Sequence, residues 1–253
     1  MPLRDFLRRH YLPDNFPTGA TLGLAATGVF VALVTLLLEF YGWQQPFLRM
    51  AAPVFGLEGV THNDLLFYAQ LYTSASFLVL LVLLPGLYHL VAPLPGENPY
   101  GLSARNFTNN MRLYLPLLAI MLPVLWIACS SPAFNEFYPL YKPATLRDLV
   151  LYEAIYLTQF IAVEFFYRGF CLFRFERLAP GLAIFIMVIP YALLHIHKPF
   201  PEALGSVVAG LVLGALALKS RSIWPGVLTH CTVALSADLF ALLHSGRMAQ
   251  LLQ

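Results

Sequence analysis

Long apolar runs alternate with short polar connectors along most of this chain. A helix needs about 20 predominantly apolar residues to cross a lipid bilayer, and seven runs reach or approach that length. They cover residues 20–39, 65–92, 113–131, 149–167, 181–196, 203–219 and 223–243. The pattern predicts an all-α fold, a polytopic transmembrane helix bundle of about seven spans, with residues 1–253 forming a single membrane domain.

Composition agrees with this interpretation. Of the 253 residues, 59% are apolar and 11% are charged, whereas a soluble domain carries about 25% charged residues. The net charge is +2 and no basic cluster resembles a nucleic-acid footprint, so we expect the lipid bilayer as a partner and no nucleic acid. Cys129, Cys171 and Cys231 lie singly in apolar runs, which favours buried, inert thiols over a disulfide framework or a zinc site.

The loops indicate an orientation. With the N-terminus inside, about twice as many Lys and Arg residues fall on the cytoplasmic side as on the outer side, in agreement with the positive-inside rule. Residues 1–19 are basic and lead into an apolar run without a small-residue cleavage site, which predicts an uncleaved first helix. We expect a multi-pass protein of a bacterial inner (cell) membrane with a cytoplasmic N-terminus.

Three stretches of the C-terminal half have distinctive patterns. The connection HIHKPFPEALG (195–205) can turn within the membrane if protein or water surrounds its backbone, since the preceding span is short and Pro190 interrupts it. In the following span, Ser206, Gly210 and Gly214 form a small-residue stripe that favours close helix packing. FCLFRFERL (170–178) alternates aromatic and basic residues, which predicts a short amphipathic helix at the membrane interface.

Ionisable residues inside these spans are the candidates for chemistry, because charge within hydrocarbon is costly and commonly functional. Glu164 and Arg168 are four residues apart and therefore share a helix face on which they can pair. Glu153 lies three turns earlier on nearly the same face. The pair is either a structural ion pair between helices or a carboxylate base whose protonation the guanidinium tunes.

Two histidines follow on later spans. His195 ends the fifth span and His230 lies about a third of the way along the seventh. Each has a structural alternative, a hydrogen bond at the interface or to a neighbouring helix. His197 and Lys198, just after the fifth span, are interpreted as solvated.

Two acids are supporting candidates. Glu202 can equally be a first-turn residue favoured by the helix dipole. Asp238 is about 12 Å along the helix from His230, which is too far for direct contact.

Glu164, His195 and His230 on three consecutive spans suggest one site. The two imidazoles can be ligands of a divalent metal such as zinc, or the three residues can activate a water by general base catalysis without any metal; the cofactor stays open. With a straight fifth span, His195 would lie toward the outside while the other two lie toward the cytoplasm. Convergence therefore requires this span to tilt or to end within the membrane.

The ordered motifs resemble those of the CPBP intramembrane protease family, also called the CAAX-protease and bacteriocin-processing or Abi family. The family patterns EExxxR, FxxxH and HxxxN align with VEFFYR (163–168), YALLH (191–195) and HCTVA (230–234). The flanking RGF and SIWPGVLTH are also similar. The family-like core covers residues 145–245. The resemblance implies motif residues around a cavity within the bilayer and hydrolysis of a peptide bond in a membrane-associated substrate, with water activated by Glu and His and an Asn helping to stabilise the oxyanion.

This sequence departs from the family pattern at two positions. Val163 replaces the first glutamate, and Ala234 replaces the asparagine. Three explanations remain. Glu164 with His195 and His230 runs altered chemistry, or Glu202 or Asp238 supplies the missing acid. Otherwise the chain is an inactive pseudoprotease that binds a membrane partner, as an immunity or scaffold protein does.

Three functions follow from these alternatives. The first is a metalloprotease-like intramembrane peptidase acting on a membrane-associated peptide or protein. The second is a non-catalytic binding protein on the same scaffold. The third is a proton-coupled transporter, since buried Glu, Asp and His also form proton relays. Transporters commonly show paired repeats, and no internal duplication is visible in the sequence.

Overall fold

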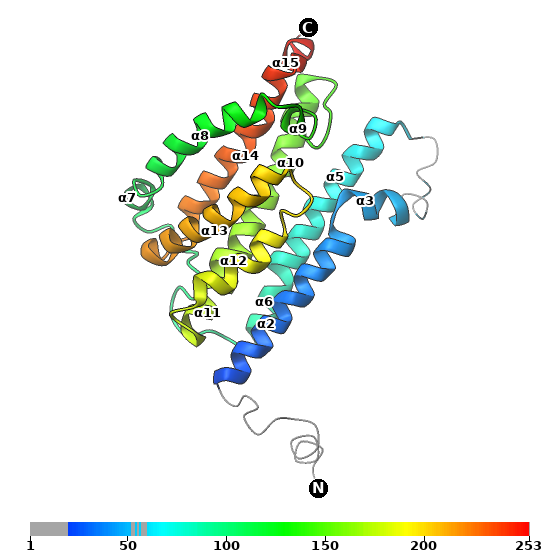
Figure 1. Ribbon diagram of the computed structural model, residues 1–253. Helices are drawn as coiled ribbons and strands as arrows, with labels where there is room; N and C mark the ends of the chain where they lie inside the picture. Colours follow the sequence, from blue (N-terminus) through cyan, green and yellow to red (C-terminus); the bar gives the residue numbers. More distant parts are fainter. Residues whose placement is uncertain (1–19, 52–53, 55, 57–59, 253) are drawn as a thin grey trace.

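The computed structural model describes residues 20–51, 54, 56 and 60–252. The described part is a bundle of helices without strands (Figure 1). This confirms the predicted polytopic helical fold. Residues 1–19, which are expected to precede an uncleaved first helix, lie outside the described residues.

The helical elements follow one another with short connections. In chain order they are α2 (Ala20–Leu37), η1 (Leu38–Gly42), α3 (Gln44–Pro46), η2 (Phe47–Ala51), α5 (His62–Leu78), η3 (Val79–Leu83), α6 (Leu84–Val91), α7 (Phe107–Met111), α8 (Leu115–Cys129), α9 (Pro132–Asn135), α10 (Leu146–Glu164), η4 (Phe165–Cys171), α11 (Leu172–Leu178), α12 (Ala183–Leu193), α13 (Phe200–Ser220), α14 (Trp224–His244) and α15 (Arg247–Leu251). The η elements are π-helical turns that continue their neighbouring α-helices.

Five helical stretches are long and apolar enough to cross a membrane. They are Thr21–Tyr41, His62–Val91, Leu146–Leu178, Phe200–Ser220 and Trp224–His244. The two remaining predicted spans are helices as well, but α8 and α12 are shorter. At 1.5 Å per residue, α12 is about 16 Å long, roughly half of the ~30 Å hydrocarbon core. The connection from α12 to α13 accordingly lies within the height of the bundle (Figure 1).

The helix that carries the first motif is the longest in the bundle. A capping box starts it: the Thr145 hydroxyl accepts a hydrogen bond from the Asp148 backbone N–H, and the Asp148 carboxylate accepts one from the Thr145 N–H. Such reciprocal bonds satisfy donors that a helix start leaves unpaired. The helix then runs through α10, η4 and α11, packing against α5 on one side and α14 on the other.

Residues 170–178 differ from the expectation of a separate interfacial helix. They continue the long helix from Leu146 to Leu178, and four consecutive side chains, those of residues 172–175, are buried. The Arg174 guanidinium lies over the rings of Tyr88 and Phe170. Aromatic faces attract cations, so this basic residue is accommodated inside the protein and not at a lipid surface.

The small-residue stripe of α13 faces α12, as the sequence predicts. A Cβ atom on Gly210 would lie 3.0 Å from side-chain atoms of Tyr191 and Val188, and one on Gly214 would lie 3.0 Å from Met187. Because these positions lack a side chain, α12 packs directly on the α13 backbone. This contact fixes the short helix that leads to His195.

The three cysteines are free thiols. Cys129 and Cys171 are buried, as expected, while Cys231 is only partly buried.

Candidate functional site

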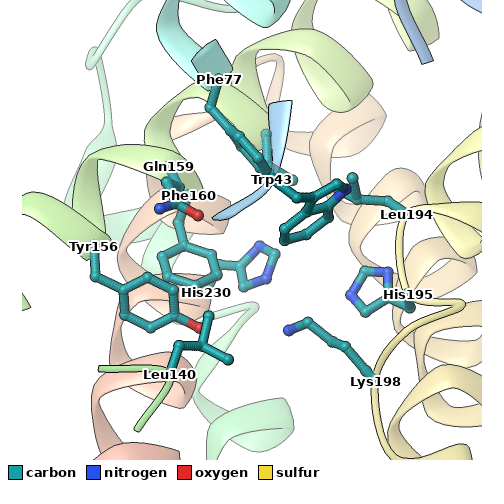
Figure 2. A pocket seen from close by; sticks show the side chains of 11 residues that line it. Trp43, Phe77, Leu140, Tyr156, Gln159, Phe160, Leu194, His195, Lys198 and His230 are labelled. Carbon is teal, nitrogen blue, oxygen red and sulfur yellow. The ribbon is translucent and has the colours of Figure 1, made fainter. Parts of the chain in front are cut away.

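A small cavity lies where α10, α14, the α12–α13 connection and Trp43 meet. Its walls include Phe160 and Val163 of α10, His195 and Lys198 of the connection, and His230 of α14 (Figure 2). The space open to the centres of water molecules is about 30 Å³, and roughly 10–15 Å³ is enough for one water. The cavity can therefore hold a reacting water next to polar side chains.

Glu164 orients the His230 ring. The Nδ1 atom of His230 lies 2.9 Å from Oε1 of Glu164, and the Glu164 side chain is completely buried. A carboxylate only accepts hydrogen bonds, so Nδ1 carries the proton and donates it, which leaves Nε2 with a free lone pair. The His230 ring projects into the cavity (Figure 2) and is tilted by 48° against the Phe160 ring, with 4.7 Å between the two centroids.

Arg168 forms an ion pair with the same oxygen of Glu164 that contacts His230. Its Nη1 lies 3.1 Å from Oε1 of Glu164, and both side chains are fully buried. The guanidinium also lies over the ring of Tyr191, 3.9 Å from its centroid. A π-helical turn, η4, begins directly after Glu164; such turns are frequent at functional sites. The charge pair thus links α10 to α12 and fixes the carboxylate that holds His230.

His195 presents a second imidazole to the cavity. Its Nδ1 lies 3.0 Å from the backbone carbonyl oxygen of Tyr191. A carbonyl only accepts, so Nδ1 is the donor and Nε2 is left unprotonated. His195 lines the same cavity as His230, and α12 ends just before it, at Leu193, three residues after Pro190. This is one of the two conditions that the sequence sets for convergence.

The sequence analysis is wrong about the surroundings of Lys198. The sequence pattern predicts a solvated residue, but Lys198 lines the cavity and its side chain is only 15% exposed. Its Nζ donates to Glu202 at 2.7 Å and to the Tyr138 hydroxyl at 3.0 Å. The i, i+4 spacing of Lys198 and Glu202 is the signal that could have found it. His197, by contrast, is exposed and pairs with Glu39.

The two supporting acids lie in different places. Glu202 is in the first turn of α13 and accepts a hydrogen bond from Tyr138 at 2.7 Å. Burial raises the pKa of Tyr138 well above its usual value, and the charge of Glu202 raises it further, so the phenol stays a neutral donor. Asp238 is fully buried beside Glu153 and does not line the cavity.

The two departures from the family motifs lie in different surroundings. Val163 lines the cavity, whereas Ala234 belongs to an apolar cluster that also contains Phe160 and Tyr156. Among the described residues that line the cavity there is consequently no carboxylate. The basic nitrogen groups among these lining residues are the two imidazoles and the Lys198 amine.

The donor set does not fit a bound metal ion. Zinc sites need three or four ligands, and the described part of the chain has no group of three His, Cys, Asp or Glu placed to hold one. His195 and His230 share the cavity with the Lys198 ammonium, which repels a cation.

Gly226 permits the close approach of α14 to Glu164. A Cβ atom on Gly226 would lie 2.8 Å from Oε2 of Glu164, and Glu164 cannot move freely because its Oε1 contacts Arg168 and His230. We expect Gly226→Ala to lower the free energy of unfolding by about 1–3 kcal/mol, as overpacking does. Denaturant unfolding in detergent micelles measures this change in the free energy of unfolding.

Gly205→Ala on α13 is the matched control. A Cβ atom there would meet nothing within 4 Å, and alanine is the better helix former. Its stability should be unchanged or slightly higher. Equal stability of the two variants would show that α14 has room at Gly226.

The fold and the cavity define a class of protein: an integral membrane protein with a polar site inside its helix bundle. Residues 145–236 match the family model of type II CAAX prenyl endopeptidase Rce1-like proteins. Comparison with curated proteins and with solved structures found no match. The match supports a CAAX-protease-like core over residues 145–236. This core departs from the family motifs at two positions, Val163 and Ala234.

Proposed function

We propose that this protein hydrolyses a peptide bond in a membrane-embedded substrate, with His230 as the general base. The observation that carries the proposal is the hydrogen bond from His230 Nδ1 to the buried Glu164 carboxylate. It leaves Nε2 of His230 unprotonated in a cavity with space for water. A carboxylate that orients an imidazole and stabilises its charged form is a recurrent arrangement in hydrolases.

The reaction can proceed without a carboxylate at position 163. A water in the cavity attacks the carbonyl carbon of the scissile bond while Nε2 of His230 takes its proton. Glu164 stabilises the resulting imidazolium, and Arg168 keeps that carboxylate in place. His195 accepts a hydrogen bond from the water through its own Nε2 and so positions it. Collapse of the tetrahedral intermediate breaks the C–N bond, and the imidazolium returns its proton to the leaving nitrogen.

The family description supports one substrate class, peptides that carry a prenyl group near their C-terminus. A prenyl chain partitions into the bilayer, which brings the scissile bond to a site enclosed by membrane helices. We further propose a bacterial inner membrane and a cytoplasmic N-terminus; the distribution of Lys and Arg supports the orientation.

The proposal is tested with purified protein in liposomes and a farnesylated peptide that ends in Cys-aliphatic-aliphatic-X. We expect release of the C-terminal tripeptide, detected by mass spectrometry, and much less release from the same peptide without the farnesyl group. The His195→Ala variant should fold as the wild type does and release much less tripeptide.

The opposite result has a defined meaning. Folded protein that releases nothing from prenylated or unprenylated peptides would overturn the peptidase proposal. It would favour the non-catalytic alternative, which rests on Val163 and Ala234. Release that persists unchanged in His195→Ala would remove this cavity as its site.

A further inference from the structure

Lys198 is a cation inside the cavity with an unused hydrogen-bond donor. An ammonium group has three N–H donors. Two are directed to Glu202 Oε1 at 2.7 Å and to the Tyr138 hydroxyl at 3.0 Å. No third acceptor contacts Nζ within the described residues. One N–H is therefore available to a molecule in the cavity, where Lys198 lies with His195 and His230 (Figure 2).

The ammonium is held in place from two sides. Glu202 lies one helical turn after Lys198 and forms an ion pair with it. Tyr138, from the segment between α9 and α10, donates to Glu202 and accepts from Lys198. The Lys198 Nζ is also 5.6 Å from the centre of the Tyr138 ring. A long flexible side chain thereby becomes a donor at a defined position, which is what stabilising a transition-state charge requires.

Other hydrogen-bond donors belong to residues that line the cavity, namely the Tyr156 hydroxyl and the Trp43 indole N–H, but both are neutral groups. Among the described residues that line it, Lys198 is the one cation. The Gln159 amide also reaches the cavity, but its Nε2 donates to Ser74 at 2.9 Å. Ala234 has no donor in its side chain, although the motif has an asparagine there. Negative charge that develops on a substrate oxygen in this cavity thus has Lys198 as its one cationic partner among the described residues that line it.

We propose that Lys198 is a catalytic residue of the hydrolysis: its ammonium donates a hydrogen bond to the carbonyl oxygen of the scissile bond and stabilises the oxyanion. Tyr138 and Glu202 are positioning residues for this ammonium. The inference rests on the proposed function, and it assigns to this chain a charged donor where the motif has a neutral amide.

The step balances in atoms and charge. Water forms the new C–O bond, its proton goes to His230 Nε2, and the carbonyl π electrons move to the oxygen. Lys198 stays protonated throughout and only donates a hydrogen bond. When the C–N bond breaks, the electrons return to the carbonyl, and the proton on His230 goes to the leaving amine.

The test compares wild type, Lys198→Met and Lys198→Arg in liposomes with the farnesylated peptide. Removing one oxyanion donor costs about 10²–10³-fold in kcat. We expect a loss of that order in Lys198→Met with KM changed less than about threefold, and partial rescue in Lys198→Arg. A phosphinate analogue of the peptide, whose tetrahedral group is anionic, should bind Lys198→Met more weakly by a similar factor, while the uncleaved peptide binds equally.

Lys219→Met is the matched control, since Lys219 is an exposed residue at the end of α13; its kcat should equal that of wild type. If Lys198→Met does not fold, Lys198→Gln, which keeps a neutral donor, takes its place with the same expected direction. The role of Lys198 would be overturned by a kcat within about threefold of wild type in folded Lys198→Met or Lys198→Gln. An equal loss of phosphinate binding and peptide binding would also overturn it. Neither result would affect the proposed function. Absence of hydrolysis in wild type would overturn the proposed function and this inference together.

Discussion

Replacing His230 with alanine should lower kcat for hydrolysis of the farnesylated peptide by about 10²–10⁴-fold, the range that a general base contributes. The reason is that Nε2 of His230 is the lone pair whose basicity the Glu164 carboxylate supports, through the 2.9 Å hydrogen bond to Nδ1. KM should change little, because the imidazole acts on the water and not on the bulk of the substrate. Initial rates across substrate concentrations in liposomes measure both constants.

His244→Ala controls for the loss of an imidazole from the same helix. His244 lies at the end of α14, outside the cavity, where its Nε2 is 3.1 Å from the Trp126 carbonyl oxygen. This variant should keep the wild-type kcat. If His230→Ala retained more than about a third of the wild-type kcat, His230 would not be the base, and the role would pass to His195.

Replacing Arg168 with methionine should lower the free energy of unfolding by about 3–5 kcal/mol, as removing one partner of a buried ion pair does. Arg168 and Glu164 are both fully buried, so the variant leaves an uncompensated carboxylate inside the bundle. It also removes the guanidinium from the face of Tyr191, 3.9 Å away. Reversible denaturation in detergent micelles gives the change.

The double variant Glu164→Gln/Arg168→Met separates charge from packing. It removes both charges, and buried pairs replaced together commonly cost little, so it should be more stable than Arg168→Met by at least about 1–2 kcal/mol. It should nevertheless be inactive, because a neutral amide at position 164 does not stabilise an imidazolium at His230. A double variant that is no more stable than Arg168→Met would show that packing of the guanidinium, and not its charge, holds this region together.

The helices and their close contacts were largely predictable. Apolar runs reveal membrane helices because a buried backbone in lipid must satisfy its own hydrogen bonds, and all seven predicted segments are helical. The spacing of Gly210 and Gly214 predicts a close helix contact, and both face α12. The i, i+4 spacing of Glu164 and Arg168 predicts their pairing. Each signal is local, since it depends on residues within a few helical turns.

Three features were not predictable from the same patterns. Residues 170–178 alternate as an interfacial helix does, but their burial depends on Tyr88 and other residues far away in the chain. Lys198 follows the end of a span, a position typical of solvated residues. It lies in the cavity wall because its ammonium donates hydrogen bonds to Tyr138, sixty residues earlier, and to Glu202. Asp238 is a candidate acid for the site by sequence, but it lies beside Glu153 of another helix and does not line the cavity.

The amino-acid sequence alone determined that this is a helical membrane protein with an acid, an arginine and two histidines in the order of the CAAX protease motifs. Hydrophobic length and helical periodicity are properties of neighbouring residues, so they can be read along the chain. Only the tertiary structure decided that α12 ends within the bundle, that Glu164 holds His230, and that Lys198 enters the cavity. Those outcomes depend on the packing of helices distant in sequence, which sets the depth and direction of each polar side chain.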